Sequence, residues 1–325
     1  MSHPRLDGSQ PAAPRSAIIA NFASIYIVWG STYLAIRFAV ESLPPFLMAS
    51  ARFLAAGSIL WITLRLSGAP RATLRQWRAS AIVGTLLLAG GNGLVSWSEQ
   101  WVPSAIAALI VGTMPLWMVL LEWILYDGRR PTLTVGLGLA LGFAGVALLA
   151  GNGNHAGSAS RWGVAALFLG CIFWAYGSLR SRKVDQGPSM LMACAMQMIG
   201  GGTVMLIIAS GLGEWSHLQV SAISMKSILA FVSLVLVGAL VGYTSYAWLL
   251  RTVSPTAVST YAFVNPVVAV FLGWWLGNET ISGRTLLAGA MVVGAVALMT
   301  MRRRPARPMA SVTVQADPVG SLEVR

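Results

Sequence analysis

The sequence predicts an all-α polytopic membrane protein whose ten transmembrane helices form two inverted five-helix repeats. Three observations predict this fold: charged residues are few, ten long apolar stretches follow one another, and two local patterns recur in the second half. Hydrophobic residues make up 56% of the 325 residues and charged residues only 10%, whereas a soluble domain carries roughly a quarter charged residues. So little charge cannot cover a water-facing surface, which excludes a soluble protein.

The ten spans follow from length and punctuation. A helix needs about 20 mostly apolar residues to cross the hydrocarbon layer, and glycine, proline and charge clusters separate ten such stretches. The predicted spans are 17–38, 45–66, 79–97, 103–126, 133–150, 162–180, 189–210, 227–249, 256–277 and 284–301. Because most connections between them are short, consecutive helices are expected to be antiparallel neighbours.

The distribution of lysine and arginine predicts the orientation of the chain. With a cytoplasmic N-terminus, 17 of the 22 basic residues lie in cytoplasmic segments, 3 lie outside and 2 lie within spans. Basic residues accumulate in cytoplasmic loops, so we expect both tails, 1–16 and 302–325, to be cytoplasmic. The net charge of +12 then reflects contact with the lipid bilayer and its anionic inner leaflet, and no nucleic-acid partner is implied.

Ten spans divide into a first repeat over 17–150 and a second over 162–301, with 151–161 as a periplasmic linker. Because five is odd, the second repeat enters the membrane in the opposite sense. Trp29 in "YIVWGSTYLAIR" matches Trp174 in "CIFWAYGSLRSR" at an offset of 145 residues. A second match, between Pro115 and Pro266, has an offset of 151 residues, and the two together indicate duplication.

The matched prolines predict where a solute binds. Proline removes an amide donor and loosens the carbonyl four residues earlier, here those of Val111 and Ala262. In lipid such a break is tolerated only where protein or a watery cavity supplies partners. Corresponding interruptions in two inverted halves therefore predict a midplane cavity shaped by Pro115 and Pro266. A plain packing kink is the alternative interpretation.

Aromatic and small polar residues of the spans are the candidates for contact with a solute. Aromatic faces with sparse hydroxyl and amide groups suit an amphiphilic or aromatic compound. The substrate-binding candidates are Trp29, Ser31, Thr32, Tyr33, Asn92, Trp97, Trp174, Tyr176, Tyr243, Tyr246 and Asn265. The alternative for each is helix packing, because serine and threonine commonly bond across helices or back to their own turn.

Charged residues within the spans predict a cluster at the outer mouth. Arg37, Arg52 and Glu99 fall near the outer ends of their spans, and Glu122 falls near an inner end. Intramembrane charge is costly and has a partner or a pathway role, so this outer cluster either closes the mouth structurally or gates and handles protons. Since no aspartate or histidine lies in any span, we expect a facilitator or exchanger driven by the gradient of its solute.

Other functional classes lack their residues. His3, His155 and His217 all fall in tails or loops, so no in-membrane nucleophile–base pair or metal site is expected, and no enzyme. The sequence contains no Gly-x4-Gly-Lys-Ser/Thr motif, which is the motif that binds the phosphates of ATP, and no cofactor is implied. A membrane sensor or scaffold without transport activity stays open as the alternative.

Two spans are expected to be scaffold. The fifth contains Gly138-xxx-Gly142 and the tenth contains Ala290-xxx-Gly294, and small-xxx-small faces allow close helix contact. We therefore assign these helices to packing or to dimer contacts in a monomer or homodimer.

The order of several motifs resembles a known family. They are "YIVWGSTYLAIR", the Pro-Pro at 44–45 followed by "ARFLAAG", the "GGNG" at 90–93, "VPSAIAAL" and "YAFVNPVVAVFLG". Together they resemble the EamA-type branch of the drug/metabolite transporter superfamily, most closely its YedA-like members, over residues 17–301. The resemblance implies two inverted five-helix repeats, a central cavity, and export of metabolites or amphiphilic compounds across the bacterial inner membrane by alternating access.

Overall fold

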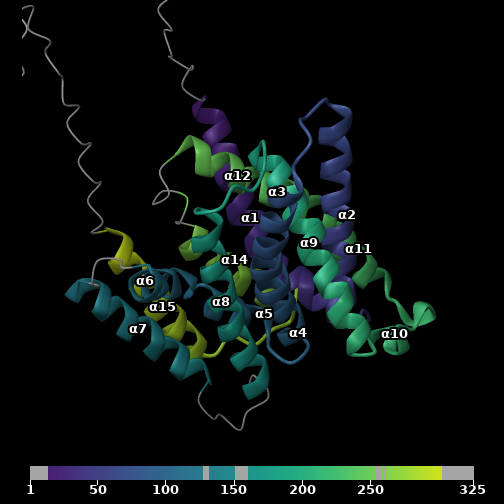
Figure 1. Ribbon diagram of the computed structural model, residues 1–325. Helices are drawn as coiled ribbons and strands as arrows, with labels where there is room; N and C mark the ends of the chain where they lie inside the picture. Colours follow the sequence, from purple (N-terminus) through teal and green to yellow (C-terminus); the bar gives the residue numbers. More distant parts are fainter. Residues whose placement is uncertain (1–13, 127–131, 151–159, 254–257, 259–260, 302–325) are drawn as a thin grey trace, which may run out of the picture.

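The computed structural model describes residues 14–126, 132–150, 160–253, 258 and 261–301, and every regular element within them is a helix (Figure 1). Seven helical segments are long and apolar enough to cross a membrane: α1 (Arg15–Ala39), α2 (Pro45–Leu66), Leu74–Ser98, Ser104–Leu125, α8 (Arg161–Ser181), α9 (Met190–Gly211) and Met225–Tyr246. Three helices with shorter apolar runs, α7 (Leu133–Ala150), α14 (Tyr261–Trp275) and α15 (Gly283–Met301), occupy the fifth, ninth and tenth predicted spans. Most of the two predicted tails and of the 151–161 linker lies outside the described residues.

The third and eighth segments share a departure from α-helical geometry. The third consists of α3 (Leu74–Gly84), the π-helix η1 (Thr85–Gly93) and α4 (Leu94–Ser98); the eighth consists of α11 (Met225–Ser233), the π-helix η3 (Leu234–Val241) and α12 (Gly242–Thr252). π-Helical turns are rare in proteins, and those that occur are often found at functional sites. Their starts are 149 residues apart, an offset close to those of the matched tryptophans and prolines.

Helix packing also repeats between the halves. The second segment, α2, packs along its counterpart α9, and α7 packs along its counterpart α15. The contact of α1 with α14 has its counterpart in the contact of α8 with α6 (Met114–Leu125). Likewise α8 packs on η1 as α1 packs on α12. This exchange of partners is the pattern expected of a duplicated chain whose two halves interlock.

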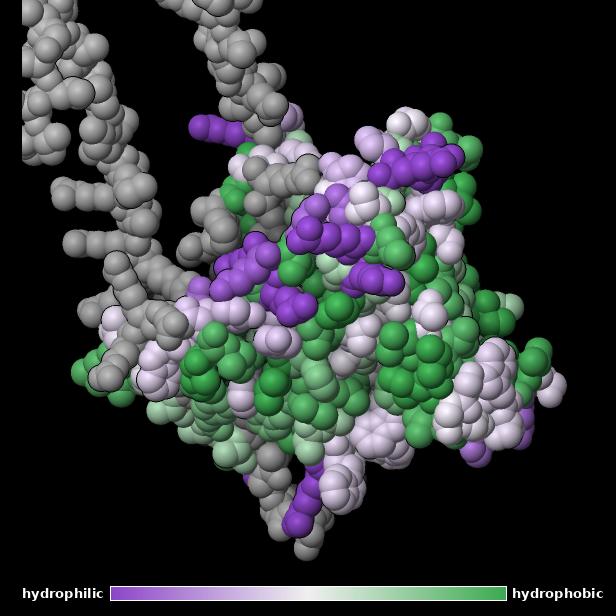
Figure 2. All heavy atoms as spheres, in the orientation of Figure 1, coloured by the Kyte–Doolittle hydropathy of each residue, from purple (hydrophilic) through white to green (hydrophobic). Residues whose placement is uncertain are grey.

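Contacts between connections show which loops share a side. The ammonium of Lys226 lies 2.7 Å from the carboxylate of Glu41, which joins the start of the eighth segment to the connection after the first. On the opposite side, Gln76 Nε2 donates to Asp185 Oδ2 at 2.9 Å, which joins the start of the third segment to the connection after the sixth. Hydrophilic side chains gather along the upper edge of the face in Figure 2, above a broad apolar region.

Two carboxylates from the second half cap helices of the first half. Helices α2 and α5 (Ser104–Val111) each follow a proline N-cap that offers no side-chain acceptor. Instead Glu214 accepts from the backbone amides of Phe46 and Leu47 at 3.2 and 2.7 Å, and Glu279 accepts from those of Ser104 and Ala105 at 2.7 and 3.0 Å. Both carboxylates satisfy free amides at the positive end of a helix dipole.

The helices α7 and α15 pack against each other through small residues, some of them at the predicted positions and some at others. On α7, Gly142 and Gly145 approach α15 closely, since a Cβ on them would lie 3.3 Å from Ala295 Cβ and 3.0 Å from Met291 Cβ, respectively. On α15, Ala288 and Ala295 are buried, whereas Ala290 is exposed. Of the predicted Ala290-xxx-Gly294 face, Ala290 therefore lies off the contact, whereas Gly294 lies at it, since a Cβ there would be 3.9 Å from Leu141 Cδ2.

Candidate functional site

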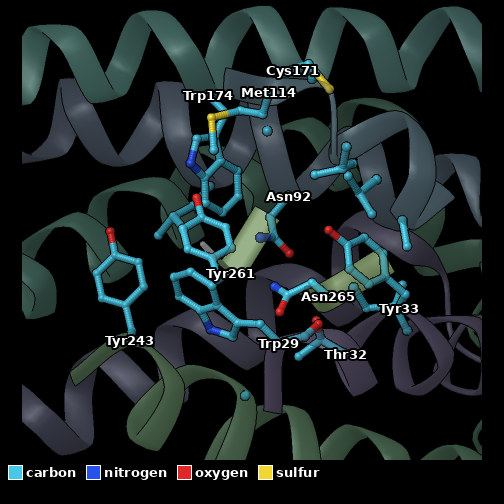
Figure 3. A pocket seen from close by; sticks show the side chains of 18 of the residues that line it. Trp29, Thr32, Tyr33, Asn92, Met114, Cys171, Trp174, Tyr243, Tyr261 and Asn265 are labelled. Atoms are coloured by element: carbon cyan, nitrogen blue, oxygen red, sulfur yellow. The ribbon is translucent and has the colours of Figure 1, made fainter. Parts of the chain in front are cut away.

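A cavity with a free volume of about 80 Å³ lies between the two halves, near the middle of the segments that line it. Space for one water requires about 10–15 Å³ by this measure, so the cavity has room for a few waters. Its lining comes from both halves: Trp29, Thr32, Tyr33, Ile36, Arg52, Phe53, Leu88, Gly91, Asn92, Val95, Ala108, Val111, Gly112, Met114, Gly170, Cys171, Trp174, Gly238, Ala239, Tyr243, Tyr261, Asn265 and Pro266. In Figure 3 the rings of Trp29, Tyr261 and Trp174 form one wall, and the amides of Asn92 and Asn265 lie between this wall and Tyr33.

The two matched tryptophans each lie against a glycine of the other half. A Cβ on Gly242 would lie 2.5 Å from Trp29 Nε1, and a Cβ on Gly91 would lie 2.6 Å from Trp174 Cε3. Real Cβ atoms essentially never approach so closely, so glycine is required at both positions if the indoles are to stay where they are. The two contacts are counterparts, and each joins one half of the chain to the other.

Aromatic packing closes one end of the cavity. Trp29 lies 5.0 Å from Tyr246 and 5.3 Å from Tyr261 between ring centroids, and the two tyrosines lie 5.9 Å apart. Beyond these rings Ile25 and Leu249 are fully buried. This end lies toward the start of α1.

A polar chain runs from the cavity toward the same side. Tyr243 donates its hydroxyl hydrogen to Gln197 Oε1 at 2.6 Å, and the Gln197 amide donates in turn to Gln186 Oε1. Gln186 then donates to the backbone oxygen of Ser181 at 2.7 Å. The lining residue Tyr243 is thereby coupled to the connection between α8 and α9.

The predicted helix breaks differ from each other. At the first, α5 ends at Val111 and α6 begins at Met114, so Pro115 stands in a first turn, where its missing amide costs nothing. Pro266 instead lies inside the continuous helix α14. Pro266 lines the cavity and Pro115 does not. The two interruptions still meet, because a Cβ on Gly112 would lie 3.0 Å from Pro266 Cγ.

Several polar groups near the cavity are satisfied by the protein itself. The hydroxyls of Ser31 and Thr32 donate to backbone oxygens three residues earlier, at 2.8 and 2.7 Å. With its nitrogen turned toward them, the Asn265 amide lies 3.3 Å from the carbonyl oxygens of Tyr26 and Tyr261. The Ser31 side chain therefore hydrogen-bonds within its own helix and does not line the cavity. The side chains of Thr32 and Asn265 hydrogen-bond to backbone oxygens and also line the cavity.

The predicted charge cluster is not held by ion pairs. Arg37 donates to the backbone oxygens of Glu99 and, at 2.9 Å, Gln100. These oxygens lie at the carboxyl end of α4, where the helix dipole stabilises a cation. The Glu99 carboxylate is fully buried and hydrogen-bonds to nothing in the described part of the chain. Arg52 is buried as well, but it faces the cavity and lies over the Phe53 ring, with 4.7 Å from Cζ to the centroid.

The structure thus brings some of the predicted residues together and leaves others apart. Those that line the cavity are Trp29, Thr32, Tyr33, Arg52, Asn92, Trp174, Tyr243, Asn265 and Pro266; those that do not are Ser31, Arg37, Trp97, Glu99, Pro115, Tyr176 and Tyr246. Trp97 lies in a separate outer pocket with Trp101 and Trp162. The sequence interpretation missed Tyr261, although its position four residues before Asn265 places both on one helix face.

Comparisons with known proteins agree with this architecture. The chain matches the EamA-like transporter family in two segments, residues 16–151 and 161–301. It is 40% identical over 296 residues to the uncharacterized inner membrane transporter YedA of Escherichia coli K12, covering 90% of this chain and 94% of that protein. It is 25% identical over 291 residues to the protein PagO of Salmonella typhimurium, covering 87% and 93%.

The fold has a counterpart among solved crystal structures. One such chain superposes with a TM-score of 0.62 at 21% identity, over 88% of this chain and 98% of that one. Two family segments, one in each half, agree with the repeated packing described above, and the match covers nearly all the helices. The chain belongs to the EamA-like transporter family.

Proposed function

We propose that this protein exports small metabolites, or amphiphilic and aromatic compounds, across the bacterial inner membrane by alternating access through the central cavity. In this proposal the ten segments form two inverted five-helix repeats with both termini in the cytoplasm. The observation that carries the proposal is an aromatic cavity lined by residues of both halves, among them the matched Trp29 and Trp174. The family and the inner-membrane relative YedA support it.

The contacts on either side of the cavity support alternating access. Rings of Trp29, Tyr246 and Tyr261 block one end, and the caps formed by Glu214 and Glu279 tie the halves together at the other. Each barrier lies between halves, so rocking one half against the other opens one end at a time.

The test is solute flux with a matched pair of tryptophan variants on α8. Compounds against which overproduction of the protein protects growing cells would then be assayed by counterflow in proteoliposomes. We expect Trp174→Ala to lose at least about tenfold in rate, because this ring forms the cavity wall. Trp162→Ala should keep wild-type flux, because Trp162 is 79% exposed outside the cavity. Folded protein without flux for any compound would favour the sensor or scaffold alternative.

A further inference from the structure

We propose that the cavity selects organic anions, and that Arg52 binds a carboxylate-like group whose apolar or aromatic body lies against the tryptophan wall. This inference names the solute class of the proposed function and rests on it in that respect. It starts from a cation that is buried in the protein and left short of partners.

Arg52 has unused hydrogen-bonding capacity. The residue is only 4% exposed, yet its Nε atom hydrogen-bonds to nothing in the described structure. The recorded side-chain bond from its Nη1 atom, to Asn92 Oδ1, is 3.5 Å long and therefore weak. A guanidinium carries five N–H donors, and a buried one is costly unless it is paired and hydrogen-bonded. A carboxylate in the cavity would supply both.

Space for the guanidinium is kept by a glycine of the other half. A Cβ on Gly238 in η3 would lie 3.2 Å from Arg52 Nη2. The π-helical turn and the missing side chain together leave the charged group room at the cavity wall.

The surrounding charges favour an anion over a cation. Arg52 is the one charged side chain among the described residues that line the cavity. Glu99 lies nearby, but it does not line the cavity and forms no ion pair with Arg52 within 4.0 Å in the described residues. The charge that directly lines the cavity is therefore a cation, which repels a lipophilic cation at close range.

The remainder of the lining defines the rest of the solute. Trp29, Trp174 and Tyr261 offer ring faces and edges suited to a flat apolar body. Asn92 carries an amide that can orient a polar substituent next to Arg52. An aromatic or branched apolar monocarboxylate therefore satisfies both walls at once.

The test uses three probes of one shape and three charges: 3-phenylpropionate, 3-phenylpropionamide and 3-phenylpropylamine. Binding to the purified full-length protein would be followed by tryptophan fluorescence and titration calorimetry. We expect the anion to bind at least about tenfold more tightly than the amide, and the amine to bind most weakly. Arg52→Gln should reduce the anion to the affinity of the amide while changing the affinity of the amide less than about threefold.

Two further variants keep the result decisive if Arg52→Gln folds poorly. Arg52→Lys retains the charge and should keep part of the anion preference. Gly238→Ala leaves all charges in place but crowds the guanidinium, so it should weaken the anion more than the amide. Equal affinities for the three probes, no binding of phenylpropionate, or an undiminished preference in Arg52→Gln would overturn the proposal.

Counterflow in proteoliposomes separates this inference from the proposed function. Tight, Arg52-dependent binding of phenylpropionate without counterflow of any probe would contradict transport and leave the anion site standing. Counterflow of the amide or amine without preference for the anion would contradict the anion site and leave transport standing.

Discussion

At the scale of single residues, the halves meet through indole rings that lie on bare backbone. Trp29 and Trp174 approach Gly242 and Gly91 so closely that any side chain there would have to displace them. These rings also form the cavity wall. Residues that hold the halves together are thus the same ones that shape the site, so packing and solute contact cannot be changed independently.

Adding one methyl group at either glycine should therefore move the wall. We expect Gly242→Ala and Gly91→Ala to shift tryptophan fluorescence and to lower flux by at least about tenfold, since overpacking costs about 1–3 kcal/mol. Gly136→Ala is the matched control, because nothing lies within 4 Å of its Cβ, and it should be neutral or stabilising by about 0.5–1 kcal/mol. Wild-type flux in both crowded variants would contradict the assignment.

Site residues could be predicted from the sequence where a pattern recurs in both halves or where a polar group stands out in an apolar span. Trp29 and Trp174 could be found because duplication marks both, and Tyr243 and Asn92 because polar groups are rare in the spans. Trp97 could not be placed, since an apolar helix gives no periodicity to say which side faces lipid. Arg52 was expected in an outer cluster with Glu99, because sequence gives depth along a helix but not the direction of a side chain.

At the scale of elements, the two proline-marked helices respond to their prolines in different ways. Pro115 follows a real break between α5 and α6, whereas α14 continues through Pro266. The spans themselves were predictable to within a few residues at most ends. The π-helices η1 and η3 were not, because "TLLLAGGNG" and "LVLVGALV" carry no feature that distinguishes a π from an α turn.

Replacing the prolines should separate these two cases. We expect Pro266→Ala to change flux at least about fivefold, because it restores a backbone donor and removes the ring that meets Gly112 at the cavity. Pro115→Ala should change flux less than about twofold, since a first-turn proline lacks only an amide that needs no partner. Equal effects of the two substitutions, measured by counterflow at matched expression, would show that Pro266 has no special role in transport.

The carboxylate caps give a second prediction for elements. We expect Glu279→Ala to lower the free energy of unfolding by about 1–3 kcal/mol, because it leaves two amides at the start of α5 without their charged acceptor. The matched control is Glu41→Ala, which removes an ion pair whose side chains are 48% and 43% exposed and should cost about 0–1 kcal/mol. Thermal unfolding in detergent measures both, and equal losses would contradict a capping role.

At the scale of the whole molecule, the orientation follows from charge and is open to direct labelling. Both native cysteines, Cys171 and Cys194, are buried, so a cysteine introduced at an exposed site can be labelled selectively. We expect Ser216→Cys to react with an impermeant maleimide in intact spheroplasts, and Ser67→Cys to react only after permeabilisation. The reverse pattern would overturn the proposed topology and the inverted-repeat arrangement with it.

The charge of the solute also sets the driving force. If the solute is a monoanion, an inside-negative potential favours its exit by about 2.3 kcal/mol per 100 mV, without any coupled ion. We expect flux of phenylpropionate in sealed vesicles to follow an imposed potential and to ignore an imposed pH gradient, in wild type and in Glu99→Gln alike. Accumulation driven by the pH gradient and lost in Glu99→Gln would instead assign proton coupling to Glu99.

The carboxylate caps have a consequence for how the protein is made. Leu47 and its partner Glu214 are 167 residues apart in the chain, and Ala105 and Glu279 are 174 apart. At about 5–20 residues per second of synthesis, the first half waits in the bilayer for roughly 8–35 s with two helix ends unfinished. During that interval the two helix ends of the first half lack the carboxylates that cap them in the finished protein. The first half of this protein is therefore completed only when Glu214 and then Glu279 have been synthesised.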